Sequence, residues 1–189
     1  MGDKALLFLD IDGVINGDSR RFSEHHRVHL SAEEMERSKS PFTHKFDDEG
    51  LTLRVSLDPR IREWVHELSE YFELVWASTW EHSANVHISP LLGLGEIGVV
   101  EHSKILPTFG EVKNHEVARW KWRGIVPYAS DRSLAFVDDQ AGPLIQLLRA
   151  QREHEGRPKS SSPFILAPRY GLDGTDMEHL LTFGASHLA

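Results

Sequence analysis

Two carboxylates follow an apolar segment near the start of the chain, in the sequence LLFLDIDGVIN at residues 6–16. Asp10 and Asp12 come after a run that is apolar enough to form a buried strand. An ionised carboxylate is costly to bury unless it is paired or bound to a metal. The segment is therefore either an ordinary strand-ending turn or part of a metal and phosphate site. Gly13 permits a tight turn that brings backbone N–H groups toward a bound phosphate.

Strands and helices alternate along most of the chain. Apolar runs predict strands at 5–9, 72–77, 97–100, 134–137 and 164–167. Amphipathic spacing and capping residues predict helices at 58–71, 82–92, 111–122 and 143–151, and a C-terminal helix opened by a capping box of Thr175 and Glu178. This order indicates an α/β fold with a doubly wound, Rossmann-like parallel sheet that has helices on both faces.

Residues 16–57 interrupt this alternation. They contain a capping-box helix start at Ser31 and Glu34, and two short β-like runs at 41–46 and 51–56. We interpret the segment as an insertion that includes a β-hairpin, within one domain that spans residues 1–189.

The composition excludes several classes of protein. The chain has no cysteine, so disulfides, thiolate zinc sites and a cysteine nucleophile are excluded. No apolar run reaches the length of about 18 residues that a membrane span requires, and the start of the chain lacks the pattern of a signal peptide. We therefore expect a cytoplasmic protein with no membrane partner.

The charge is unevenly distributed. The net charge of −8 argues against tight non-specific binding to nucleic acids. Residues 18–62, however, carry nine basic and nine acidic residues together with four histidines. This neutral, histidine-rich part of an acidic chain is either a solvated surface or the part that meets an anionic substrate.

Polar side chains follow three of the predicted strands. They are Asp10 and Asp12 after the first strand, Ser78 and Thr79 after the second, and Asp138 and Asp139 after the strand at 134–137. In a doubly wound sheet, ligands bind beyond the carboxyl ends of the strands. Three such clusters at one edge of the sheet are more than turns alone require.

These motifs resemble those of the haloacid dehalogenase (HAD) superfamily of phosphohydrolases. LLFLDIDGVIN, LVWASTW, Lys113 and AFVDD occur in the order of the four superfamily motifs. The segments WASTWEHSAN at 76–85, LGL at 92–94 and YGLDGTDMEHL at 170–180 are similar to the compact HAD domain in or beside bacterial Swiss Army Knife RNA-repair proteins.

The resemblance implies a Mg²⁺-dependent phosphomonoester hydrolase that forms an aspartyl-phosphate. Asp10 would be the nucleophile and Asp12 the general acid and base. Ser78 would hydrogen-bond a phosphoryl oxygen, and Lys113, or Lys104 in its place, would neutralise charge on Asp10 and the phosphate. The implied Mg²⁺ ligands are Asp10, Asp12 through its backbone carbonyl, Asp138 and Asp139.

The resemblance also implies a capless or minimally capped enzyme, with the insertion as a flap over an open site. An open site favours a phosphate at the end of a bulky molecule, and we expect a nucleic-acid terminus, of RNA in keeping with the resemblance. Gly13, Thr79 and Trp80 are the expected substrate contacts; Trp80 either stacks on a base or belongs to the core. The alternatives are a small-metabolite phosphatase or nucleotidase, and a non-catalytic phosphate-binding or docking module.

Overall fold

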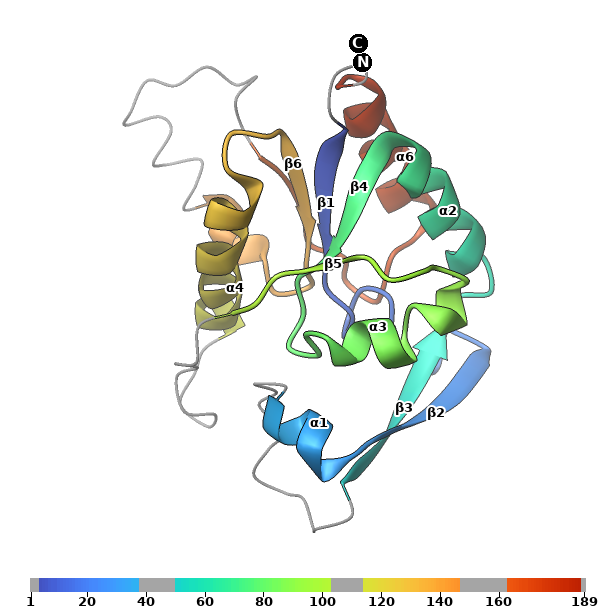
Figure 1. Ribbon diagram of the computed structural model, residues 1–189. Helices are drawn as coiled ribbons and strands as arrows, with labels where there is room; N and C mark the ends of the chain where they lie inside the picture. Colours follow the sequence, from blue (N-terminus) through green and yellow to red (C-terminus); the bar gives the residue numbers. More distant parts are fainter. Residues whose placement is uncertain (1–3, 38–49, 103–113, 147–162, 188–189) are drawn as a thin grey trace.

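The protein is built around a five-stranded parallel sheet (Figure 1). The computed structural model describes residues 4–37, 50–102, 114–146 and 163–187. The strand order is β5-β4-β1-β6-β7. The strands are β1 (Ala5–Leu9), β4 (Phe72–Trp76), β5 (Gly98–Val99), β6 (Leu134–Val137) and β7 (Phe164–Leu166). The α/β class and the parallel, Rossmann-like sheet are confirmed.

Helices cover both faces of the sheet. Figure 1 shows α4 (Asn114–Ala129) on one side, and α2 (Ile61–Tyr71) with α6 (Gly174–Ala185) on the other. Residues 142–146 are also helical. Among the described helices, none combines the length and apolar character that crossing a membrane would demand.

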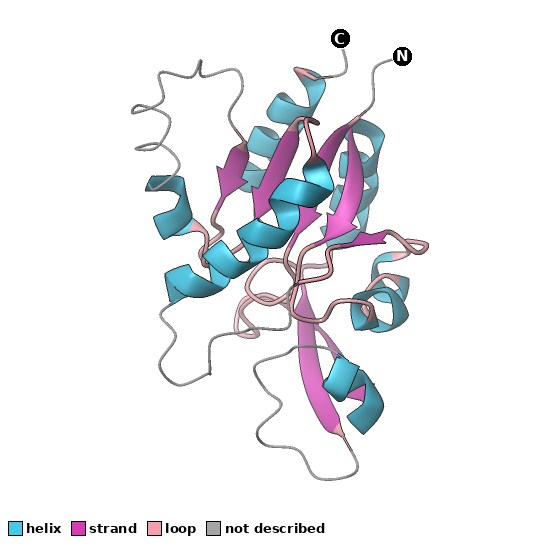
Figure 2. Ribbon diagram, turned by 60° about the vertical axis from the view of Figure 1, so that its left-hand side comes forward, coloured by secondary structure: helices cyan, strands magenta, loops and turns pink. Residues whose placement is uncertain are grey.

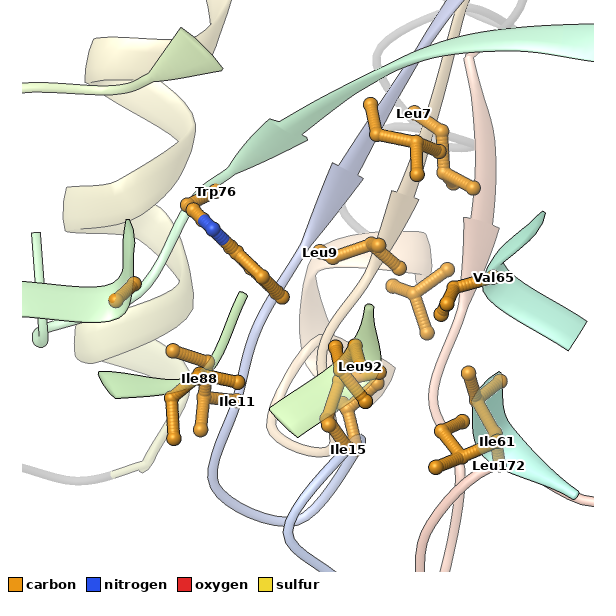
Figure 3. Packing of buried hydrophobic residues seen from close by; sticks show 14 of the residues in the cluster. Leu7, Leu9, Ile11, Ile15, Ile61, Val65, Trp76, Ile88, Leu92 and Leu172 are labelled. Atoms are coloured by element: carbon orange, nitrogen blue, oxygen red, sulfur yellow. The ribbon is translucent and has the colours of Figure 1, made fainter. Parts of the chain in front are cut away.

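The side chains of β1 alternate between two cores because successive residues of a strand point to opposite faces. Leu6 and Phe8 pack with Ile125 and Ala129 of α4. On the other face, Leu7 and Leu9 join a larger cluster (Figure 3). Its labelled members include Ile11, Ile15, Ile61, Val65, Trp76, Ile88, Leu92 and Leu172. Side chains two apart on β1 therefore share a face.

Several helix boundaries differ from the prediction. Helix α4 continues to Ala129, past the expected end at residue 122, and it contains Pro127. The expected helix at 82–92 is split into α3 (Ser83–His87) and a 3₁₀ turn, η1 (Pro90–Leu92). The capping box of α6 is formed by Asp173 and Asp176, so the helix begins before the predicted box.

The inserted segment forms an antiparallel hairpin that projects beyond the carboxyl end of the sheet (Figure 2). Its strands are β2 (Glu24–Leu30) and β3 (Leu51–Leu57). Strand β2 was not predicted, and the expected run at 41–46 lies outside the described residues. The predicted capping box is confirmed: Ser31 and Glu34 exchange hydrogen bonds at the start of α1 (Ala32–Arg37).

One face of the hairpin belongs to the protein core. Val28, Leu30, Val55 and Leu57 are buried in the same cluster as α2. Two side-chain contacts join the inserted segment to the helices: Glu24 of β2 pairs with Arg62 of α2, and Glu34 of α1 accepts a hydrogen bond from His87 of α3. The pKa of Glu24 is lowered to about 2, first by its hydrogen bonds to Arg62 and His26.

Candidate active site

The register of the sheet brings two carboxylates side by side. Leu9 is paired with Val137, so the residues that follow them, Asp10 and Asp138, leave neighbouring strands at the same level. The backbone N–H of Asp10 also donates to the carbonyl of Val137, at 2.9 Å. Both side chains are buried, Asp10 at 4% and Asp138 at 0% exposed. Two buried carboxylates this close together require positive charge beside them.

That positive charge comes from Lys121. Its Nζ lies 2.6 Å from Oδ2 of Asp10 and 2.7 Å from Oδ2 of Asp138. Lys121 is 3% exposed and stands on α4, four residues before Ile125. Because residues four apart share a helix face, Lys121 points toward the side of the sheet that Leu6, Phe8 and Asp10 face.

The other carboxylate oxygen of Asp10 and of Asp138 also accepts a hydrogen bond. The backbone N–H of Ile11 donates to Oδ1 of Asp10, at 2.8 Å. The backbone N–H of Gln140 donates to Oδ1 of Asp138, at 2.7 Å, in the turn that precedes the helical residues 142–146. Asp138 thus stabilises a turn and binds Lys121 through different oxygens.

The single positive charge of Lys121 does not neutralise the carboxylates of Asp10, Asp138 and Asp139. Burial raises the pKa of Asp10 to about 7; Lys121 opposes that rise, and the charge of Asp138 adds to it. Although burial lowers the pKa of Lys121, the charges of Asp10 and Asp138 raise it above its ordinary value. Desolvation and the charge of Asp138 raise the pKa of Asp139 to about 6. A cation at this place would keep the carboxylates ionised at neutral pH.

The carboxylates of Asp10, Asp138 and Asp139 form a set that fits a metal ion. One oxygen of each lies within 4.8 Å of the others. All three ligand atoms are oxygens, which is the donor type that Mg²⁺ prefers. The residues present therefore fit the expected ion. The contribution of the Asp12 carbonyl stays a prediction.

Asp12 is held in one orientation by two donors. The indole N–H of Trp80 donates to Oδ2 of Asp12, at 2.8 Å. The side-chain amide of Asn16 donates to Oδ1, also at 2.8 Å. The charge of Asp12 contributes to the raised pKa of both Asp10 and Asp139, so its carboxylate faces the same acidic group.

The turn after Asp12 depends on Gly13. Gly13 has a φ of +83°, a conformation that L side chains rarely adopt, and a Cβ there would collide with Asp139. Its N–H donates to the carbonyl of Asn16, at 2.8 Å. Ser78 and Thr79 lie at the end of β4 and are buried, 1% and 9% exposed. Their contacts with a phosphate stay predictions.

The geometry adds a lysine to the site and corrects one expectation. Lys121 lies beside Asp10, in the position expected for Lys113 or Lys104. Those two lysines lie outside the described residues, so their assignment stays a prediction. Trp80 is 3% exposed and packs in the core, so its ring is not available for stacking on a base. Its indole N–H instead donates to the carboxylate of Asp12.

The sequence contains a signal for Lys121 that the prediction missed. Val117, Ile125 and Ala129 form a buried stripe at helical spacing on α4, and Lys121 occupies the one remaining position of that stripe. A charged residue in an apolar stripe indicates a buried partner of opposite charge. Asn16 was also missed; it binds both Asp12 and the backbone N–H of Ser56, at 2.8 Å.

Comparison with known protein families relates the chain to one of them. A family model described as the HAD domain in Swiss Army Knife RNA repair proteins matches residues 6–173, which include every site residue described above. No curated protein and no solved structure matches the chain significantly in the same comparisons.

Proposed function

The chain belongs to the family of HAD domains in Swiss Army Knife RNA repair proteins, which are hydrolases of the HAD type, and we propose that it is a Mg²⁺-dependent phosphomonoester hydrolase. Its nucleophile is Asp10, and its substrate is a phosphate at the end of an RNA chain. The observation that carries the proposal is the contact of Lys121 with both Asp10 and Asp138.

Asp10 is placed to attack phosphorus. Lys121 and the N–H of Ile11 each hold one of its oxygens, which orients the carboxylate. Attack forms the bond between Asp10 and phosphorus and breaks the bond to the leaving oxygen, giving an aspartyl-phosphate. Lys121 offsets the negative charge that the dianion brings to a site with four nearby carboxylates.

Asp12 is placed to move the protons. It gives a proton to the leaving oxygen, and its ionised form then takes a proton from the water that hydrolyses the intermediate. Trp80 and Asn16 keep this carboxylate in position for both steps. Mg²⁺, held by Asp10, Asp138 and Asp139, would supply positive charge to the phosphoryl oxygens.

Binding of Mg²⁺ is expected to stabilise the fold. An ion that binds only the folded state at 100 times its Kd adds about 2.7 kcal/mol to the free energy of unfolding. For a chain of this size, that corresponds to a rise in melting temperature of about 5–11 °C. The measurement is thermal unfolding of the EDTA-treated protein with and without added Mg²⁺, compared with Ca²⁺.

The control for this measurement is Asp139→Asn. This change removes one of the three acidic ligands at the exposed side of the site and leaves the contacts of Lys121 in place. We expect a smaller rise in melting temperature at the same Mg²⁺ concentration. An equal rise in the melting temperature of the wild type and of Asp139→Asn would indicate that the ion binds elsewhere.

The substrate proposal predicts a preference for long substrates. The insertion of residues 16–57 is short for a cap that encloses a small metabolite, and its described part consists of one hairpin and one short helix. A phosphorylated oligonucleotide should exceed the matching mononucleotide in kcat/KM by at least about tenfold, which equals about 1.4 kcal/mol of additional transition-state binding. Release of inorganic phosphate measures both reactions.

Two outcomes would contradict parts of this proposal. Equal kcat/KM values, or a preference for a sugar phosphate, would favour a small-metabolite phosphatase or nucleotidase. No phosphate release from oligonucleotides with 5′- or 3′-phosphates, from nucleotides or from p-nitrophenyl phosphate would favour a non-catalytic phosphate-binding module.

A further inference from the structure

We infer that the exposed face of the hairpin β2–β3 and the neighbouring loop around Tyr170 bind the polynucleotide chain that leads to the terminal phosphate. The inference rests on the proposed function and names the surface that would make the substrate an oligonucleotide rather than a mononucleotide. We define this surface by Arg27, Arg54, Tyr170 and the two arginines beside Tyr170.

The two faces of the hairpin differ in character. One face carries the apolar residues that join the core. On the other face the cross-strand pairs are His25 with Ser56, Arg27 with Arg54, and His29 with Thr52. This second face is entirely polar and carries no acidic residue.

Arg27 and Arg54 stand directly opposite one another at the centre of that face. Both are exposed, and neither has an ion-pair partner in the described part of the chain. Two like charges at opposed positions destabilise a hairpin. An anion bound between or beside them would remove this repulsion, and a phosphodiester group is an anion that arginine binds well.

Two arginines lie over an aromatic ring on the adjacent loop. Tyr170 is 39% exposed, and the guanidinium carbons of Arg21 and Arg169 lie 5.1 and 5.0 Å from its ring centroid. Exposed aromatic rings stack on bases of single strands, and arginines beside them contact the backbone. Tyr170, together with the guanidinium groups over its ring, therefore supplies a stacking surface that the buried Trp80 does not.

A short segment of backbone connects both parts to the active site. Asn16 binds Asp12, and the next residue, Gly17, donates its N–H to the carbonyl of Ser56 on β3, at 3.0 Å. The N–H of Asp18 donates to the carbonyl of Tyr170, at 3.2 Å. Strand β3 and the Tyr170 loop thus flank residues 17–18, immediately after the turn that holds Asp12.

The combination of groups favours a single-stranded polynucleotide over an acidic protein. Arg27 and Arg54, which have no ion-pair partner among the described residues, provide contacts for phosphates, and Tyr170 provides a stacking surface for a base. The net charge of the chain is −8, so anions are repelled by most of the molecule. Binding must then depend on local positive charge, and the hairpin face supplies it.

The test is binding of a fluorescein-labelled, phosphate-terminated RNA ten-mer, followed by fluorescence anisotropy as a function of salt. Arg54→Glu should weaken binding at least about tenfold and reduce the slope of log K against log salt by about 0.7 for each phosphate that no longer meets a cation. The melting temperature of this variant should not fall, because the new carboxylate would face Arg27 with opposite charge. Retained stability separates a failure to bind from a failure to fold.

Arg123→Glu is the matched control. Arg123 is exposed on α4, which covers the other face of the sheet, and the substitution changes the net charge by the same amount. It should leave RNA binding within about twofold of the wild type. Equal weakening of RNA binding by both substitutions would overturn the inference, because the loss of affinity would then come from the net charge of the protein and not from the hairpin face.

A second pair of variants tests the stacking position. Tyr170→Leu should weaken binding of the ten-mer about 5- to 160-fold, whereas Tyr170→Phe should retain it, because the ring rather than the hydroxyl makes the contact. Neither should change the hydrolysis of p-nitrophenyl phosphate. Unchanged RNA binding by the leucine variant would remove Tyr170 from the surface.

Binding and hydrolysis separate this inference from the proposed function. The protein could release phosphate from monoesters and yet bind the ten-mer no more tightly than the mononucleotide. That result would contradict the proposed RNA-binding surface but not the proposed hydrolase activity. The protein could instead bind the ten-mer in a way that depends on Arg54 and release no phosphate from any monoester. That result would support the RNA-binding surface and contradict the proposed hydrolase activity.

Discussion

Replacing Asp10 by Asn is expected to reduce phosphate release at least about 10²-fold, to less than about one per cent of the wild-type rate. The amide keeps the volume of the carboxylate but cannot form the acyl-phosphate. The fold should remain intact, because burial already raises the pKa of Asp10 to about 7 and a neutral side chain is well tolerated there. Steady-state phosphate release and thermal unfolding together measure the two effects.

Asp12→Asn is the matched control for the role of the nucleophile. It keeps Asp10 and its contact with Lys121 but removes the group that activates water. With p-nitrophenyl phosphate, whose leaving group needs little acid assistance, it should show a burst of p-nitrophenol followed by slow turnover. Activity of Asp10→Asn above about one per cent of the wild type would exclude the aspartyl-phosphate mechanism.

Replacing Lys121 by Met is expected to affect both activity and stability. Phosphate release should fall at least about 10²-fold, because Asp10 and the phosphate lose the cation that offsets their charge. Removing one partner of a buried ion pair costs about 3–5 kcal/mol, since the remaining charge is left unpaired. For the metal-free protein this corresponds to a fall in melting temperature of about 6–20 °C.

Added Mg²⁺ should restore part of this stability, because the ion would replace positive charge between Asp10 and Asp138. Lys113→Ala and Lys104→Ala are the controls, since sequence alone favoured those lysines, and both should retain near-wild-type activity. Loss of activity in Lys113→Ala with full activity in Lys121→Met would reverse the assignment. Thermal unfolding with and without Mg²⁺, together with phosphate release, measures the outcome.

The local pattern of the sequence was sufficient for the sheet and its acidic edge. Five apolar runs predicted the five strands, and the polar residues after three of them predicted where the site lies. Both follow from short-range rules: a strand buried on both faces must be apolar throughout, and the carboxyl ends of parallel strands meet at one edge. Asp10 and Asp138 were found in this way.

The partner of those carboxylates was decided by tertiary structure. The prediction ended the helix at residue 122, so Ile125 and Ala129 were not recognised as part of the stripe that contains Lys121. In a helix that ended at residue 122, Lys121 stood in the last turn, and only Lys113 and Lys104 were considered for this position. Only packing of α4 on the face of β1 that Asp10 shares selects Lys121.

For strand β2 and Trp80 too, tertiary structure decided what the local sequence left open. The alternation of EHHRVHL is weak because three histidines and an arginine occupy it, and its pairing with β3 joins segments that are separated by the residues between Leu30 and Leu51. Trp80 follows a strand end, where sequence permits either exposure or burial; its hydrogen bond to Asp12 and its core contacts bury it. Local patterns thus identified which residues could do chemistry and at which edge of the sheet. Long-range packing decided which cation faces Asp10, which ring holds Asp12 and which ring stays exposed, because contacts between distant segments leave no periodic signal in either segment alone.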